Sequence, residues 1–148
     1  GIYGMVGGQV ADIEAEEAFD PLTMEQLLFI HENKTAALIQ SALMIGAALA
    51  GAQQKQIDEM ERIGYLVGIA YQIEDDILDV TSTLEELGKP IGSDEKNHKT
   101  TYVTLVGIEK AKEEAEKLSK EALDRLHALM GEDTFLEELI GSLVNRRK

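Results

Sequence analysis

The chain has 148 residues, a formal net charge of −14 and no cysteine. This length allows one domain with a hydrophobic core, and the lack of cysteine excludes a disulfide-stapled secreted domain. The acidic balance disfavours binding to nucleic acid or anionic membranes, because like charges repel at long range. With 44% hydrophobic residues, only 2 prolines and few aromatics, the composition is typical of packed helices.

We expect no secretory signal and no membrane span in this sequence. No uninterrupted apolar run of about 18 residues occurs, so we expect no membrane span. No basic segment precedes an apolar stretch at the N-terminus, and we therefore expect a cytoplasmic protein. The chain opens at Gly1 without methionine and ends on residues 145–148, which resemble a natural terminus. We interpret it as a fragment that lacks its N-terminal part, although processing or proteolysis would look the same.

The first expected helix covers residues 3–17 despite the adjacent Gly7 and Gly8. Glycine weakens a helix, so a pair of them suggests close packing or a nearby ligand. The sequence Phe-Asp-Pro at 19–21 ends the pattern, because proline interrupts helical hydrogen bonding.

Two longer helices are expected next. Thr23 and Gln26 stand at capping-box spacing and predict a helix start. This helix extends to about Gly51, with a break expected near Asn33. A third helix is expected over residues 54–80, where apolar residues recur at helical spacing.

Residues 81–100 are expected to be irregular, because glycine, proline, serine, aspartate and lysine cluster there. Ordered loops of this length are often functional. The remaining helices are expected at 101–106, at 109–130 and from Asp133 or Thr134, with Thr134 and Glu137 at capping-box spacing. The pattern predicts a single all-α domain or part of one.

An aspartate cluster near the end of the third helix is the most informative feature. At about 100° per residue, Asp75 and Asp79 share one helical edge, with Asp76, Gln72 and Gly68 on the same arc. Three neighbouring carboxylates repel one another, and Mg²⁺ offsets that repulsion while sharing its coordination sphere with phosphate oxygens. The alternative is a solvated acidic face.

Lys34 lies in an apolar helical stripe, which is unfavourable unless the ammonium reaches water or an anion. With the hydroxyl of adjacent Thr35, it could clamp a diphosphate. A lysine at the edge of the stripe that reaches water is the alternative. His31 is interpreted as a packed or surface histidine rather than a metal ligand.

Two further segments add polar groups. In the loop, Lys89 and Lys99 accompany glycines whose backbone amides can approach anions. In the first helix, Gln9 and Asp12 share a face beside the glycine pair. Polar residues at the rim of a helix-packing contact are the alternative for that face.

These segments, in this order, resemble the trans-prenyl diphosphate synthases of the farnesyl and geranylgeranyl diphosphate synthase type. The matching stretches are the GMVGGQ…D pattern of residues 4–12, HENKT at 31–35, YQIEDDILD at 71–79, and GKPIGSD with HKTTY over 88–102. The resemblance covers the whole chain and implies the C-terminal half (residues 1–148) of an antiparallel helical bundle of the isoprenoid synthase type. The family's first aspartate-rich motif and arginine-rich site are absent.

The resemblance implies a role for each matching residue. Asp75, Asp76, Asp79 and Asp94 would serve the Mg²⁺ cofactor, Asp94 through a metal-bound water. Lys34, Lys89 and Lys99 would neutralise diphosphate. Gln9, Thr35 and Gln72 would lie near the reacting end of the allylic substrate, and Arg146, Arg147 and Lys148 would close over isopentenyl diphosphate. Departures from the family's common residues are Ala36, Tyr71, His98 and Val103, and none removes a carboxylate or a lysine.

The implied activity is a Mg²⁺-dependent prenyltransferase that condenses an allylic diphosphate with isopentenyl diphosphate. The implied partners are the missing N-terminal half and, for the full enzyme, a second copy in a homodimer. The isolated fragment is expected to be inactive. A class I terpene cyclase is disfavoured, because its mixed second metal motif is not found. A non-catalytic helical subunit that partners an active synthase is the alternative from another class.

Overall fold

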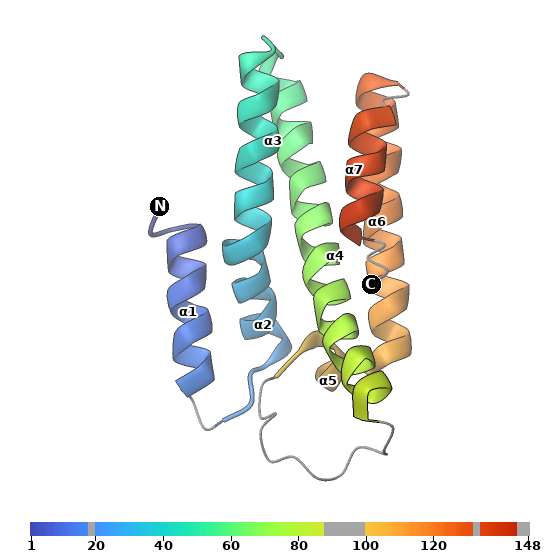
Figure 1. Ribbon diagram of the computed structural model, residues 1–148. Helices are drawn as coiled ribbons and strands as arrows, with labels where there is room; N and C mark the ends of the chain where they lie inside the picture. Colours follow the sequence, from blue (N-terminus) through green and yellow to red (C-terminus); the bar gives the residue numbers. More distant parts are fainter. Residues whose placement is uncertain (18–19, 88–99, 132–133, 145–148) are drawn as a thin grey trace.

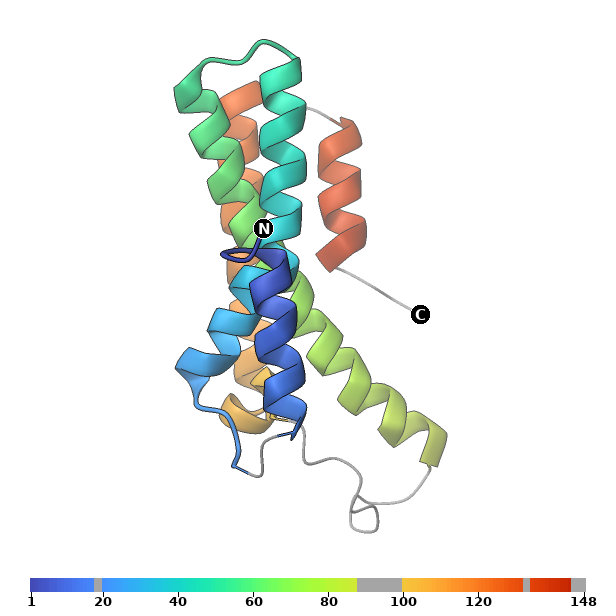
Figure 2. The ribbon, with the colours of Figure 1, turned by 90° about the vertical axis from the view of Figure 1, so that its left-hand side faces the viewer.

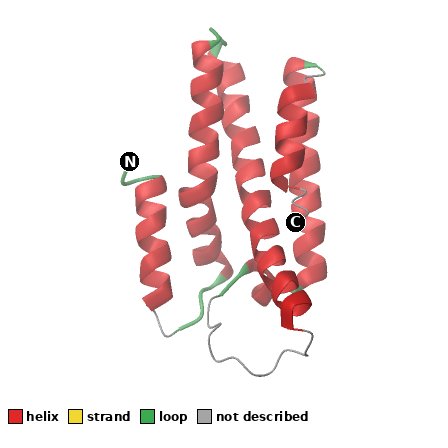
Figure 3. Cartoon of the chain, viewed as in Figure 1, coloured by secondary structure: helices red, strands yellow, loops and turns green. Residues whose placement is uncertain are grey.

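The structure is a computed structural model that describes residues 1–17, 20–87, 100–131 and 134–144. Within these ranges every regular element is a helix and no strand occurs (Figures 1 and 3). The long helices run side by side in alternating directions, as Figure 1 shows. The expected all-α antiparallel bundle is thereby confirmed. None of the described helices combines the length and the apolar character needed to cross a membrane.

Seven α-helices and one π-helical turn make up the described chain. They are α1 (Met5–Glu17), α2 (Met24–His31), the π turn η1 (Glu32–Ala36), α3 (Ala37–Leu49), α4 (Gln54–Leu87), α5 (Tyr102–Val106), α6 (Ile108–Met130) and α7 (Thr134–Val144). The elements α2, η1 and α3 follow one another without a loop and form one rod beside α4 (Figure 1). The shorter α1 lies against α2 and η1 (Figure 2).

The predicted start of α2 is confirmed: the Thr23 side chain accepts a hydrogen bond from the Gln26 amide, and the Gln26 side chain accepts one from the Thr23 amide. The break expected near Asn33 takes the form of the π turn, so the rod continues through it. A π turn inserts one extra residue into a helix and changes the direction of the side chains around it.

The predicted end of α4 at residue 80 is wrong, because the helix continues to Leu87. Residues 81–87 contain neither glycine nor proline, and the first helix breaker is Gly88. The Thr81 hydroxyl donates to the Ile77 carbonyl within the helix, which removes its competition for other backbone groups. The capping box expected at Thr134 involves a side chain outside the described residues, although α7 does begin at Thr134.

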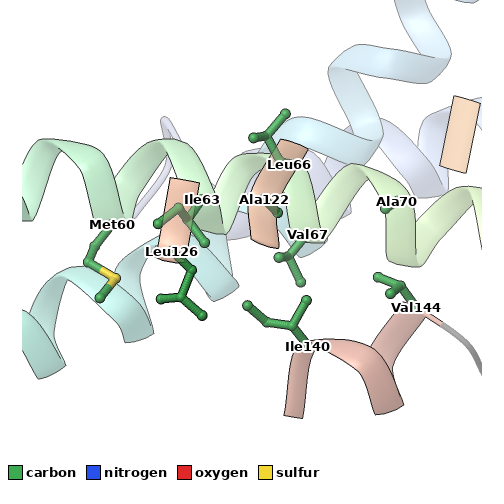
Figure 4. Close-up of a cluster of buried hydrophobic side chains, with 9 residues drawn as sticks. All are labelled: Met60, Ile63, Leu66, Val67, Ala70, Ala122, Leu126, Ile140 and Val144. Atoms are coloured by element: carbon green, nitrogen blue, oxygen red, sulfur yellow. The ribbon is translucent and has the colours of Figure 1, made fainter. Parts of the chain in front are cut away.

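The main hydrophobic core lies where α4 packs against α6 and α7 (Figure 4). Its buried members are Met60, Ile63, Leu66, Val67 and Ala70 on α4, Ala122 and Leu126 on α6, and Ile140 and Val144 on α7. The α4 positions recur at spacings of three and four residues, so they form one face of the helix. Each large side chain buried in this way contributes about 1.5–3 kcal/mol.

A second core cluster lies nearer the C-terminal end of α4. It joins Ala36 of η1, Ile69, Ile73 and Ile77 of α4, Val103 of α5, and Ala111 and Ala115 of α6. This cluster fixes η1 and α5 against α4. The elements η1 and α4 carry the predicted site residues Lys34, Thr35, Gln72, Asp75, Asp76 and Asp79.

Candidate active site

The π turn η1 is held between α1 and α4 by two close backbone approaches. A Cβ added to Gly8 of α1 would lie 2.5 Å from the carbonyl carbon of Asn33 and from the amide nitrogen of Lys34. A Cβ added to Gly68 of α4 would overlap the Cα and Cβ of Ala36. Only glycine permits contacts this close, so the sequence at both positions sets how deeply η1 is enclosed.

Lys34 projects from η1 towards α1, where its Nζ atom lies 2.5 Å from Oδ2 of Asp12. The Asp12 side chain is nearly buried, with 12% exposed, and the Lys34 side chain is 34% exposed. The sequence predicted that this lysine needs an anion, and Asp12 supplies one within the chain. Gln9, on the same helix, is half-buried.

Thr35, the next residue of η1, turns the other way towards α4. Its hydroxyl donates a hydrogen bond to Oε1 of Gln72. The π turn therefore directs two neighbouring polar side chains to opposite helices, Lys34 to α1 and Thr35 to α4. Both are only partly exposed, which favours a fixed orientation for each.

The aspartates continue the face of α4 that looks at η1. Gly68 and Gln72 contact η1, and Asp75 lies one turn beyond Gln72, with Asp79 one turn further. Asp75 is half-buried and Asp79 is exposed. The site thus runs along one side of α4, from the glycine contact to the carboxylates.

The Asp76 carboxylate contacts the start of α5 and lies near α2. Its Oδ2 accepts a hydrogen bond of 2.7 Å from the backbone amide of Tyr102 at the start of α5. The same oxygen lies 4.0 Å from Nε2 of His31. The His31 side chain is buried, which confirms the interpretation of this histidine as a packed residue.

Neighbouring Glu74 belongs to the opposite side of α4. Burial raises the pKa of its carboxyl above the usual range, and the positive charge of Lys112 on α6 partly opposes the shift. Glu74 therefore faces α6 rather than η1 and is a natural control for charge changes at the site.

The carboxylates along α4 meet part of what a divalent metal ion requires. Among the residues that the structure describes, no three carboxylate or histidine side chains converge on one point. Asp75 and Asp79 offer carboxylate oxygens one helical turn apart. Two such carboxylates fit Mg²⁺, which uses one or two protein carboxylates together with water and substrate phosphate oxygens.

Several predicted site residues lie outside the described ranges. They are Lys89, Asp94, Lys99, Arg146 and Arg147, and their predicted roles stay predictions. Of the others, the structure brings Lys34, Thr35 and Gln72 together around η1, with the aspartates next along α4.

The sequence did not identify the two contacts that tie the site together. The pairing of Asp12 with Lys34 had a partial signal, since Asp12 lies one turn after the Gly7–Gly8 pair, which predicted close packing or a nearby ligand for this helix. The bond between Asp76 and the Tyr102 amide joins residues 26 positions apart. It involves a backbone donor, and no side-chain pattern predicts such a contact.

Residues 1–134 match the family described as polyprenyl synthetase. The chain is 45% identical over 126 residues to a protein named geranylgeranyl pyrophosphate synthase, chloroplastic, of Capsicum annuum; the match covers 85% of this chain and 34% of that protein. Among solved structures, it resembles a geranyltransferase of Helicobacter pylori complexed with magnesium and isoprenyl diphosphate, at 37% identity and a TM-score of 0.73, covering 98% of this chain and 47% of that one. It also resembles an FPP/GFPP synthase of Zymomonas mobilis, at 28% identity and a TM-score of 0.81, covering 97% of this chain and 46% of the other. The chain thus spans between a third and a half of the length of these relatives.

Proposed function

The chain belongs to the polyprenyl synthetase family, and from this membership we propose that it supplies one half of a prenyltransferase site. The proposed reaction condenses an allylic diphosphate with isopentenyl diphosphate and lengthens the prenyl chain by one isoprene unit. Because the chain spans less than half of its solved relatives, the activity is proposed for this half together with the rest of the domain. The isolated chain is proposed to be inactive.

The observation that carries the proposal is the set of complementary groups on η1 and along one side of α4. The Thr35 hydroxyl of η1 bonds to Gln72 of α4, and the ammonium of the adjacent Lys34 pairs with Asp12 of α1. The carboxylates of Asp75 and Asp79 follow within the next two turns. A diphosphate bridged to the carboxylates by a cation could reach Lys34 from there, and neither group alone would attract so anionic a ligand to a chain of net charge −14.

Mg²⁺ is the proposed cofactor, and Asp75 and Asp79 are the residues proposed to hold it. When bound, the metal would neutralise diphosphate oxygens and stabilise the negative charge that grows as the allylic C–O bond breaks. Lys34 would add positive charge at the same leaving group, which favours the transition state over the ground state. The remaining site residues are proposed to have the roles that the family resemblance implies. Diphosphate would be neutralised by Lys89 and Lys99, a metal-bound water would be held by Asp94, and isopentenyl diphosphate would be covered by Arg146 and Arg147.

Thr35 and Gln72 are proposed to orient the substrate beside the cleaved bond. Their mutual hydrogen bond fixes both side chains before substrate arrives, which lowers the entropy lost on binding. Their sequence neighbours Ala36 and Ile73 are buried in the second core cluster. Apolar side chains next to the site would limit the access of water to an allylic carbocation.

The test of this proposal uses Asp75→Asn, with Glu74→Gln as the matched control, in the chain produced together with the complementary half of the domain. Each substitution removes one carboxylate charge, but Glu74 faces α6. We expect Asp75→Asn to lower turnover by about 100-fold or more, on the scale of a lost electrostatic contact in the transition state. The Glu74→Gln variant should stay within about threefold of wild type. Equal turnover of wild type and Asp75→Asn at saturating Mg²⁺ would reject the proposal.

A non-catalytic subunit is the second candidate, and the exposed apolar side chains of α1 and α3 favour some form of partner. They include Met5, Val6, Val10 and Ile13 on α1 and Leu38 and Ile45 on α3, each between 45% and 59% exposed. Such exposure suggests that other helices cover these faces. If mixing the chain with the complementary half restores prenyl transfer, the chain is a catalytic half; if it binds an intact synthase and adds no turnover of its own, it is a subunit.

Two further expectations depend on the whole protein. A homodimer is proposed for the complete enzyme and can be measured by its mass in solution. The cytoplasmic location stays a prediction, and several plant relatives carry the word chloroplastic in their names.

A further inference from the structure

The Asp76 carboxylate accepts a hydrogen bond from the backbone of another element, the start of α5. Its side chain is only 14% exposed, and Oδ2 lies 2.7 Å from the amide nitrogen of Tyr102. Tyr102 is the first residue of α5, and the first amides of a helix have no partner inside the helix. A carboxylate is a favourable acceptor there, because it also interacts with the positive end of the helix.

We propose that Asp76 is a positioning residue, whose carboxylate fixes the start of α5 against α4 instead of serving mainly as a metal ligand. This inference rests on the proposed function and divides the aspartate cluster by task. Asp75 and Asp79 are the candidates for the metal, and Asp76 holds the polypeptide beside it.

The position of α5 matters because the segment at its start joins several parts of the site. Thr101 caps α5 by accepting from the Thr104 amide, so the Tyr102 amide needs a separate acceptor, which Asp76 provides. Thr100 precedes this cap in the sequence, and its Oγ1 accepts a hydrogen bond of 3.0 Å from the amide of Leu22. Leu22 lies just before the start of α2, so this bond ties the two segments together.

The buried side of α5 extends this connection into the core. Val103 packs into the second core cluster with Ile73 and Ile77. His31 of α2 lies 4.0 Å from the same oxygen of Asp76. Asp76 therefore lies where α2, α4 and α5 meet, one residue from Asp75. The segment that Asp76 anchors begins at Thr100, and Lys99 directly precedes it in the sequence.

An asparagine at position 76 separates the two possible roles. Asn keeps an oxygen that can accept from the Tyr102 amide, but it loses the negative charge that a divalent cation favours. Alanine removes both. For a positioning residue, Asn should preserve most of the function and Ala should lose it; for a metal ligand, both should fail together.

The experiment compares Asp76→Asn, Asp76→Ala and Asp75→Asn in the 148-residue chain. Its first readout is hydrogen exchange of the Tyr102 amide by NMR, which requires neither metal nor turnover. We expect Asp76→Ala to speed this exchange by about tenfold or more, as for the loss of one hydrogen bond to a charged group. The Asp76→Asn and Asp75→Asn variants should each change it by less than about threefold.

The second readout is titration with Mg²⁺ alone. We expect Asp75→Asn to weaken Mg²⁺ affinity by about tenfold or more and Asp76→Asn to weaken it clearly less, since a carboxylate ligand contributes more than a nearby charge. Unchanged Tyr102 exchange in both Asp76 variants would overturn the inference, as would equal weakening of Mg²⁺ binding by Asp76→Asn and Asp75→Asn.

The two readouts separate this inference from the proposed function. If the wild-type chain binds no Mg²⁺ without substrate, the turnover of Asp75→Asn in the completed domain decides the metal assignment of Asp75, while the exchange rate of Tyr102 still decides the role of Asp76. If Asp76→Ala does not fold and Asp76→Asn folds with slow Tyr102 exchange, the positioning role is supported, because the uncharged Asn then still protects the Tyr102 amide as an acceptor.

Discussion

The ammonium of Lys34 lies 2.5 Å from Oδ2 of Asp12, and this ion pair connects α1 to the π turn. It forms where Gly8 brings the two backbones into contact. The aspartate is nearly buried and the lysine is partly shielded, so the attraction is less screened than in an exposed pair. Lys34 is thereby held in one place on the proposed diphosphate side of the bundle.

Replacing Asp12 by alanine should destabilise the chain. The Lys34 ammonium would lose its partner while remaining partly desolvated, at a cost of about 1–2 kcal/mol in the free energy of unfolding. Urea unfolding followed by circular dichroism measures this difference. An Asp12→Ala, Lys34→Met double mutant should recover part of the lost free energy of unfolding, because the uncompensated charge of Lys34 is also removed.

The control for this prediction is Glu14→Ala, because Glu14 is exposed on the same helix and carries the same charge. Its effect should remain within about 0.5 kcal/mol. Equal destabilisation by both substitutions would show that charge or helix propensity on α1, and not the contact with Lys34, determines the result.

Much of the fold was predictable because it depends on local patterns. The capping box at Thr23 and Gln26 and the apolar spacing of α4 determine helices through neighbouring residues. The end of α4 was misplaced because the glycine, proline and polar residues of 81–100 were treated as one irregular segment, whereas the first helix breaker is Gly88 and the Thr81 hydroxyl is satisfied inside the helix. Local propensity is a weak guide where a long helix is already packed.

The candidate site was predictable as a set of residues but not as a set of contacts. Helical periodicity placed Gln72 with Asp75 and Asp79 on one side of α4. It could not show that Asp76 binds the Tyr102 amide, because that bond depends on how α5 returns to the bundle. The π turn was also hidden, since an extra residue in a helical turn follows from the packing of Ala36 against Gly68 rather than from composition.

Gly68→Ala should disrupt the contact between α4 and η1. The added methyl group would overlap the Cα and Cβ of Ala36, and overpacking of a rigid backbone contact costs about 1–3 kcal/mol. The shift should also disturb the hydrogen bond between Thr35 and Gln72, one turn along α4. Chemical denaturation and the NMR signals of these two side chains provide the measurements.

Gly46→Ala is the matched control for this substitution. Gly46 lies inside α3, and a Cβ there would meet no atom within 4 Å. Alanine favours a helix more than glycine does, so this variant should be stabilised by about 0.5–1 kcal/mol. We expect the free energy of unfolding to fall in Gly68→Ala and to rise in Gly46→Ala. Stabilisation by both substitutions would contradict the close approach at Gly68.

The ion network between α4 and α6 gives a pH-dependent prediction. Arg125 donates from Nε to Glu121 at 3.0 Å and from one terminal nitrogen to Glu59 at 2.7 Å. The hydrogen bond from Arg125 lowers the pKa of Glu121 below its ordinary value of 4.5. A carboxyl whose pKa is lower in the folded state stabilises the fold above its unfolded pKa, and this contribution is lost as the pH falls through the folded value.

Glu121→Gln should therefore lower the urea midpoint at pH 7, and the difference from wild type should shrink steadily below about pH 4.5, where wild-type Glu121 also becomes neutral. Glu116→Gln is the control, because Glu116 is exposed on the same helix and its replacement changes the net charge equally. Added salt should reduce the Glu121 effect at pH 7, since exposed ion pairs are screened. A difference between Glu121→Gln and wild type that persists undiminished at pH 3 would mean that the glutamine disturbs packing, and that the charge of Glu121 contributes nothing to holding α6 against α4.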